Sequence, residues 1–154
     1  MNSSDDDVRQ LYRKHVPEVA SGIVEVVGVA REPGQYTMIA VHSHDSSINP
    51  VSACVGKGAA LTKAVMRELG GGISILEWSE SLPEFIARTM LSHRRGRFRP
   101  PTVSLNEATH QAHVQVEPET VDYMTSRDGL FLKLSCRLVG WDIKLSPYGQ
   151  NSVT

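Results

Sequence analysis

Two short turns combine small residues with a cation and carry the clearest chemical signal in the sequence. They span residues 56–59, which read Gly-Lys-Gly-Ala, and residues 126–129, which read Ser-Arg-Asp-Gly. Small residues let a ligand's backbone approach closely, because no large side chain holds it away. A helix that begins just after such a turn offers free N–H groups and the positive end of its dipole to a phosphate. Both turns are therefore candidate phosphate sites, and an ordinary connection between two helices is the alternative.

Sequence signals on both sides of the first turn predict that it joins two helices. Asn49 can cap the free amides of a short helix that Pro50 opens, since proline loses no hydrogen bond at the first helical position. Three glycines at 70–72 end the helix that follows the turn. That helix is indicated by apolar residues at helical spacing: Leu61, Val65 and Leu69.

Runs of β-branched residues predict a three-stranded sheet around these helices. Residues 23–29 and 36–42 flank a turn that contains Pro and Gly, which is typical of a hairpin. Residues 73–76 form the third expected strand, and a short helix at 8–15 precedes the hairpin. The residues ahead of that helix are expected to form a tail.

The second half repeats the order helix, strand, strand, helix, tight turn, helix, strand. Pro50 and Pro118 open corresponding helices 68 positions apart. The apolar stripe recurs 69 positions later, so that Leu61, Val65, Leu69 and Gly71 precede Leu130, Leu134, Leu138 and Gly140. A shared order of elements with shared proline and glycine positions indicates a tandem duplication.

The composition is that of a folded protein. The chain has 154 residues, 40% of them apolar, with 16 Lys or Arg against 17 Asp or Glu and a formal net charge of −1. A disordered chain would have fewer apolar residues or a larger charge imbalance. The small net charge does not exclude nucleic-acid binding, because a local basic patch is enough.

The sequence predicts neither a membrane protein nor a secreted one. No run reaches the roughly 18 apolar residues of a membrane span, and the polar, acidic residues 1–7 are unlike a secretory signal. We therefore expect a cytoplasmic protein in which Cys54 and Cys136 are reduced thiols. Residues with the spacing of a nucleophile motif or a metal cluster are not evident, so we expect no enzyme activity, no cofactor and no metal.

Two helices joined by a small-residue turn and packed on a three-stranded sheet are the plan of a KH module. The sequence resembles the tandem KH region of the NusA family of bacterial transcription factors from about residue 16 to residue 145. The resemblance lies in segments spread over both repeats: 16–19 (VPEV), 22–25 (GIVE), 29–34 (VAREPG), 39–41 (IAV), 49–51 (NPV), 53–56 (ACVG), 68–71 (ELGG), 77–79 (EWS), 85–87 (FIA), 137–141 (RLVGW) and Ile143.

The resemblance implies an α+β fold of two tandem type II KH domains, each a three-stranded sheet packed with helices. It also implies that the two domains pack together and bind single-stranded RNA as one extended surface. The expected role is in transcription elongation, termination or antitermination, with RNA polymerase or other transcription proteins as partners. Full-length members carry a polymerase-binding domain and an oligonucleotide-binding barrel before the KH pair. We expect neither domain in this sequence, which resembles the short KH-only members of the wider family or a paralog of the full factor.

The resemblance also sets the expected domain limits. We expect a tail and linker helix at 1–15, a first KH domain at 16–80, a connecting helix and arginine-rich linker at 81–101, a second KH domain at 102–147 and a tail at 148–154.

Both turns depart from the Gly-x-x-Gly of the family. Ala59 stands in place of the last glycine of the first turn and Ser126 in place of the first glycine of the second, where Asp128 would also repel phosphate. Because Ala and Ser are small, we expect weakened RNA binding rather than none. The predicted RNA contacts are Gly56, Lys57, Gly58, Ala59, Lys63, Ser126, Arg127, Gly129 and Lys133.

An arginine-rich segment with one aromatic residue is a further candidate. Four arginines around Phe98 suit phosphate pairing and base stacking, and a solvated linker is the alternative. The residues of this auxiliary patch are Arg94, Arg95, Arg97 and Arg99. The departures at the two turns also leave a second hypothesis, a KH-fold protein-interaction module that has lost RNA binding and docks on a protein partner.

Overall fold

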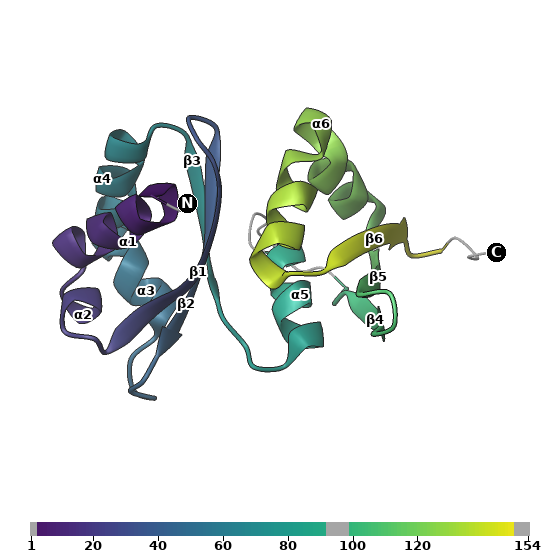
Figure 1. Cartoon of the computed structure of the whole chain (residues 1–154), viewed down its shortest axis with the longest axis horizontal. Coiled ribbons are helices and arrows are strands. Elements are labelled where there is room, and N and C mark those ends of the chain that lie inside the picture. Colours follow the sequence, from purple (N-terminus) through teal and green to yellow (C-terminus); the bar gives the residue numbers. More distant parts are fainter. Residues whose placement is uncertain (1–2, 92–98, 150–154) are drawn as a thin grey trace. The chain divides into compact units, whose positions relative to one another are not determined.

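The computed structural model describes residues 3–91 and 99–149. The chain divides into two compact units, Met1–Trp78 and Ser79–Thr154, and in each unit helices cover one face of a three-stranded sheet (Figure 1). The division falls ahead of the connecting segment expected at 81–101. The finer domain limits given above stay a prediction.

The first unit has two helices, a hairpin, two further helices and a third strand. Its elements are α1 (Ser3–His15), α2 (Pro17–Ala20), β1 (Val24–Glu32), β2 (Tyr36–Ser43), α3 (Pro50–Val55), a short 3₁₀ turn (Lys57–Ala59), α4 (Ala60–Leu69) and β3 (Gly72–Glu77).

The sheet of the first unit has β2 at its centre. β1 pairs with β2 antiparallel and β3 joins β2 parallel, with Ile39 of β2 opposite Val29 on one side and Ile75 on the other. The register of β1 shifts between Val26 and Gly28, so Val27 is the extra residue of a β-bulge. β1 is an edge strand, so the bulge lies at one edge of the sheet.

α1 begins at Ser3, whereas the sequence predicted a tail up to Val8. Asp5 and Asp6 lie in the first turn, where the helix dipole favours acidic side chains. The apolar side of α1, which includes Tyr12, is buried in the core, so packing holds the helix. That core forms from residues of the helices and the sheet: Val8, Tyr12, Val16, Val24, Val26, Ile39, Val41, Cys54 and Val65.

Both cysteines carry free thiols, and one of them lies in this core. Cys54 is fully buried, whereas Cys136 is partly exposed. Burial raises the pKa of the Cys54 thiol to about 12, because the charged thiolate would lose its hydration. Cys54 is therefore protonated at neutral pH and packs as a small apolar residue.

The second unit repeats the architecture of the first. β4 and β5 pair antiparallel, and β6 joins β5 parallel, which gives the same strand order. The predicted order of elements is confirmed in both units. The elements are α5 (Leu82–Leu91), β4 (Thr102–Asn106), β5 (Gln111–Val116), α6 (Pro118–Val139) and β6 (Asp142–Pro147). α6 leaves helical backbone at residues 126–129, so it comprises two helices joined by the predicted turn.

The two repeats correspond with a spacing of 70 residues after the turns, not the predicted 69. Gly70 ends α4 and Gly140 ends α6, while β3 and β6 begin at Gly72 and Asp142. The apolar stripe led to the error because each helix carries apolar residues at several neighbouring positions. Helix ends fix the correspondence better, since each end depends on one glycine with a left-handed backbone.

Among the described residues, no helix is both long enough and apolar enough to cross a membrane.

The cap of α3 gives a first prediction. Oδ1 of Asn49 accepts a hydrogen bond from the backbone N–H of Ser52 at 3.0 Å. We expect Asn49→Ala to lower the free energy of unfolding by about 1 kcal/mol, because an amide at the helix start loses its acceptor. Asn49→Ser keeps a capping oxygen, so its free energy of unfolding should fall by only a fraction of the loss in Asn49→Ala. Urea unfolding of both variants measures the two losses. Equal losses in the two variants would contradict this role of the cap.

Candidate nucleic-acid interface

The first turn joins α3 to α4 and exposes its two central residues. Lys57 and Gly58 are both exposed, and a Cβ added to Gly58 would meet nothing within 4 Å. Ala59 is the N-cap of α4 and its side chain makes no capping hydrogen bond. A phosphate that approaches here would meet a cation, open space and the N-terminus of a helix at one place.

Gly56 is required by packing within the turn. Its φ is +78°, and an added Cβ would lie 2.6 Å from Cγ of Leu61 and 3.0 Å from the Leu61 backbone nitrogen. The first residues of α4 therefore fold back tightly over this glycine. This contact explains the glycine without any ligand, so Gly56 alone does not indicate RNA binding.

The last position of each turn adopts the left-handed conformation. Ala59 has φ 60° and ψ 26°, and Gly129 has φ 75° and ψ 24°. That conformation costs a residue with a Cβ about 1–2 kcal/mol, whereas glycine adopts it freely. Ala59 is thus strained at the position where the second turn has glycine.

The second turn uses its polar groups for local contacts. The guanidinium carbon of Arg127 lies 5.6 Å from the ring centroid of Phe131, which itself stacks on Tyr123 at 4.7 Å. The Ser126 hydroxyl donates to the backbone carbonyl of Tyr123 at 2.6 Å. Asp128 is exposed beside them. This turn offers a phosphate less than the first turn does, because its cation and hydroxyl are engaged and a carboxylate stands nearby.

In each unit, a shallow hollow beside the helix that follows the turn has matching residues. Each hollow contains a lysine, a sulfur-containing side chain three residues on and an arginine four residues on. They are Lys63, Met66 and Arg67 on α4, and Lys133, Cys136 and Arg137 on α6, each pair being 70 positions apart.

These hollows extend the predicted site by two arginines. Lys63 and Lys133 were predicted, but Arg67 and Arg137 were not. Charged residues on an exposed helix face usually have no binding role, so each arginine alone gave no signal. The spacing Lys-x-x-x-Arg in both repeats was a signal that could have found them, because residues four apart lie on one face of a helix.

The arginine-rich segment is described only at its end. The guanidinium carbon of Arg99 lies 3.8 Å from the ring centroid of Tyr148, and the Arg99 backbone N–H donates to the Glu117 carboxylate at 3.3 Å. Arg99 therefore packs against its own unit. Arg94, Arg95 and Arg97 lie outside the described residues.

Across the ranges 3–91 and 99–149, no group of three or more His, Cys, Asp or Glu residues could hold a metal ion.

The fold and the turns define a class of protein. In each unit, helices cover one face of a three-stranded sheet, and two of them meet at a short turn with consecutive left-handed residues, so the chain consists of two tandem type II KH domains. A family model described as the NusA-like first KH domain matches residues 2–78. The chain belongs to the NusA-like KH family.

Curated relatives named "Transcription termination/antitermination protein NusA" align with nearly the whole chain. The protein from Rickettsia conorii is 35% identical over 144 residues, which are 93% of this chain and 28% of the relative. The Thermus thermophilus protein is 32% identical over 137 residues, 88% of this chain and 34% of the relative. The Halalkalibacterium halodurans protein is 30% identical over 139 residues, which are 90% of this chain and 35% of the relative. The chain thus spans about a third of the length of these relatives.

A solved structure supports the fold across both units. The crystal structure of APE1850 matches 96% of this chain and 99% of its own chain with a TM-score of 0.63. The identity is 13%, so this likeness concerns the fold alone.

The strain at Ala59 gives a second prediction. We expect Ala59→Gly to be neutral or to raise the free energy of unfolding by up to about 1 kcal/mol, because relief of the left-handed strain exceeds the added entropy of the unfolded chain. Ala60→Gly is the matched control, since Ala60 has right-handed helical angles of −63° and −39°. That control should lose about 0.5–1 kcal/mol in denaturant unfolding. Equal losses at the two positions would show that Ala59 is not strained.

Proposed function

We propose that this chain binds single-stranded RNA through its two KH domains and acts in transcription elongation, termination or antitermination. The observation that carries the proposal is the cationic pair beyond each turn, Lys63 with Arg67 and Lys133 with Arg137, which recurs at the same place in both units. The names of the aligned relatives support the role in transcription.

The first domain is the stronger of the two proposed RNA contacts. Its turn presents the exposed Lys57 beside open space at Gly58, so a phosphate can approach the backbone. Lys63 and Arg67 then lie along the following helix, where successive phosphates of the same strand can pair with them. Phosphate contacts of this kind provide affinity and position without reading sequence.

The second domain contributes less affinity. Arg127 is drawn over the Phe131 ring, and Asp128 repels an approaching phosphate. Lys133 and Arg137 are the groups of this domain that we expect to meet the strand. Four or five phosphate contacts in all give a modest, salt-sensitive binder, since each contact adds about 0.7 to the logarithmic salt slope.

The third prediction tests the first turn by titration of labelled single-stranded RNA at low salt. We expect Lys57→Gln to weaken binding severalfold and to lower the salt slope by about 0.7, the contribution of one phosphate contact. Lys57→Asp should weaken binding further, because it adds a repelling charge.

Lys14→Gln is the matched control for charge. Lys14 lies on α1 and pairs with Glu68 at 3.3 Å, and its loss changes the net charge by the same amount. RNA affinity should stay within about twofold in this variant. Equal weakening by Lys14→Gln and Lys57→Gln would rule out the turn as the site. Absence of saturable binding to the unaltered chain at low salt would contradict RNA binding itself and favour the protein-interaction module.

A further inference from the structure

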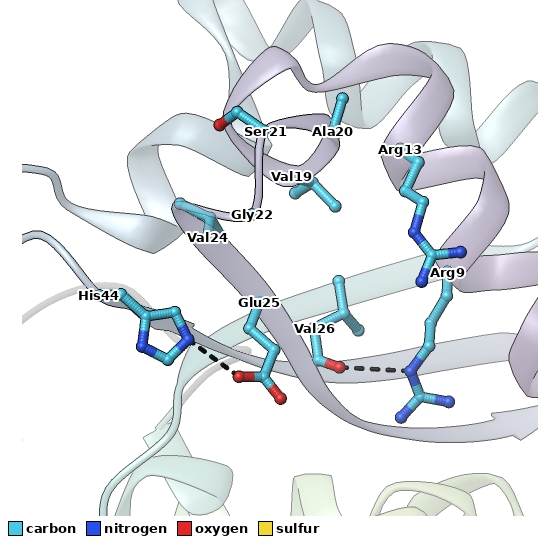
Figure 2. A pocket seen from close by; sticks show the side chains of 10 residues that line it. All are labelled: Arg9, Arg13, Val19, Ala20, Ser21, Gly22, Val24, Glu25, Val26 and His44. Carbon is cyan, nitrogen blue, oxygen red and sulfur yellow. Dashed lines mark hydrogen bonds and ion pairs between the residues drawn. The ribbon is translucent and has the colours of Figure 1, made fainter.

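The first unit contains a cavity of about 400 Å³ that the proposed RNA site does not use. It lies between α1, the connection from α2 to β1, and β1 itself (Figure 2). The turn residues 56–59 do not line it, and neither do Lys63 and Arg67. Its volume falls within the range of small-molecule sites, roughly 300–1,000 Å³.

Two arginines from successive turns of α1 reach into this cavity. Arg9 and Arg13 are four residues apart, so both lie on one side of the helix, and Figure 2 shows their side chains directed toward β1. Two like charges at this spacing repel each other. An anion between them would remove that repulsion.

The first arginine is held in place by the β-bulge. The Arg9 guanidinium donates through Nε to the carbonyl of Val26 and through Nη2 to the carbonyl of Val27, both at 3.3 Å. The bulge leaves these carbonyls of the edge strand available. A guanidinium has five N–H donors, so Arg9 keeps others for a ligand while its position is fixed.

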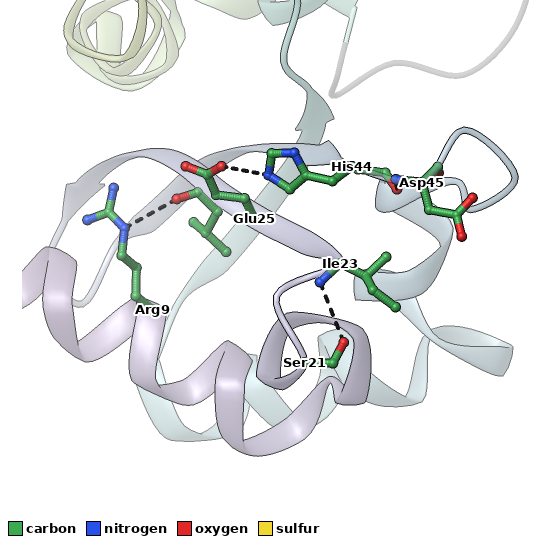
Figure 3. A network of polar contacts seen from close by, with 8 residues as sticks. Arg9, Ser21, Ile23, Glu25, His44 and Asp45 are labelled. Carbon is green, nitrogen blue, oxygen red and sulfur yellow. Dashed lines mark hydrogen bonds and ion pairs between the residues drawn. The ribbon is translucent and has the colours of Figure 1, made fainter.

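The second arginine has no protein anion. Among the residues that the structure describes, no carboxylate lies within ion-pair distance of Arg13, which is exposed. Of the described residues, Glu25 is the one acid that lines the cavity, and its Oε1 lies 3.0 Å from Nε2 of His44. Figure 3 shows this contact between the two side chains. Glu25 is therefore engaged by an imidazole and not by the arginines.

We propose that this cavity binds the phosphate of a nucleotide, either a free nucleotide or one unit of an RNA strand. A pair of guanidinium groups matches the geometry of phosphate oxygens. A phosphate ion fills only part of the cavity, and the rest is lined by Val19, Ala20 and Val24 on one side and by the polar Glu25–His44 pair on the other. An apolar wall and hydrogen-bonding groups beyond the phosphate site suit the nucleoside part. This inference does not depend on the proposed function, because it concerns other residues.

The fourth prediction is tested on the whole chain by NMR titration with adenosine monophosphate, inorganic phosphate and adenosine. We expect the monophosphate to shift saturably the amide signals of residues around the cavity, from Ser21 to Glu25. Arg13→Gln should weaken this binding about tenfold, the loss of one hydrogen-bonded contact to a charged group. Arg13 is the chosen position because it pairs with no carboxylate among the described residues, whereas Arg9 also holds the bulge. Lys14→Gln, on the neighbouring position of α1, should leave binding unchanged.

A second arm distinguishes the source of the nucleotide. If RNA is the source, Arg13→Gln also weakens single-stranded RNA binding in a variant that already lacks Lys57. If the free nucleotide is the source, Arg13→Gln leaves RNA affinity unchanged. Either result supports the cavity as a binding site, provided that the monophosphate binds there. If Lys57→Gln leaves RNA affinity unchanged, that result contradicts the proposed function alone and not the cavity site.

Four results would overturn the inference. They are no saturable shift with millimolar monophosphate, equal binding by Arg13→Gln, inorganic phosphate that binds as tightly as the monophosphate, and an acidic peptide that binds more tightly than either.

Discussion

Each domain depends on a reversal of the chain between two helices, made by consecutive residues in the left-handed conformation. Gly58 and Ala59 make it in the first domain, and Arg127, Asp128 and Gly129 in the second. This backbone places the first amides of the following helix at the exposed end of the turn. Because side chains with a Cβ disfavour the conformation, the composition of the turn is set by folding as well as by a ligand. Stability and the candidate interface therefore rest on the same few residues.

The charges of this chain act locally, so the net charge of −1 says little about its surface. Arginines and lysines gather in pairs one helical turn apart, as at Lys63 and Arg67, while the acids lie at helix starts and in contacts such as Lys14 with Glu68. The hydrogen bonds from His15 and Lys14 lower the pKa of the Glu68 carboxyl, so that acid stays ionised and holds α1 to α4. Such a distribution leaves cationic patches exposed on a nearly neutral molecule.

The order of elements could be predicted because its signals are local. The Asn49 cap, the hairpin turn and the glycine at each helix end all depend on neighbouring residues. The predicted spacing between the two repeats was 69 residues, one fewer than the structure shows. An apolar helix face is several residues wide, so its pattern fits a spacing of 69 as well as one of 70. Arg67 was missed because it became a candidate only beside Lys63, with which it lines one hollow of the folded protein. The cavity could not be predicted at all, because it needs α1 to lie across a bulge at Val27.

The two arginines of the cavity differ in their roles: Arg9 stabilises the fold, and Arg13 is available to an anion. Hydrogen bonds from a charged group to the carbonyls of Val26 and Val27 contribute about 1.5–3 kcal/mol each, which exceeds the roughly 0.2–0.5 kcal/mol of repulsion between like charges at this spacing. Folding therefore tolerates Arg13 beside Arg9 without needing its charge. Arg9 is already held by these hydrogen bonds, so a ligand that pairs with it need not order that side chain. The exposed side chains of Arg13 and Lys57 differ, because each must be ordered when a phosphate binds.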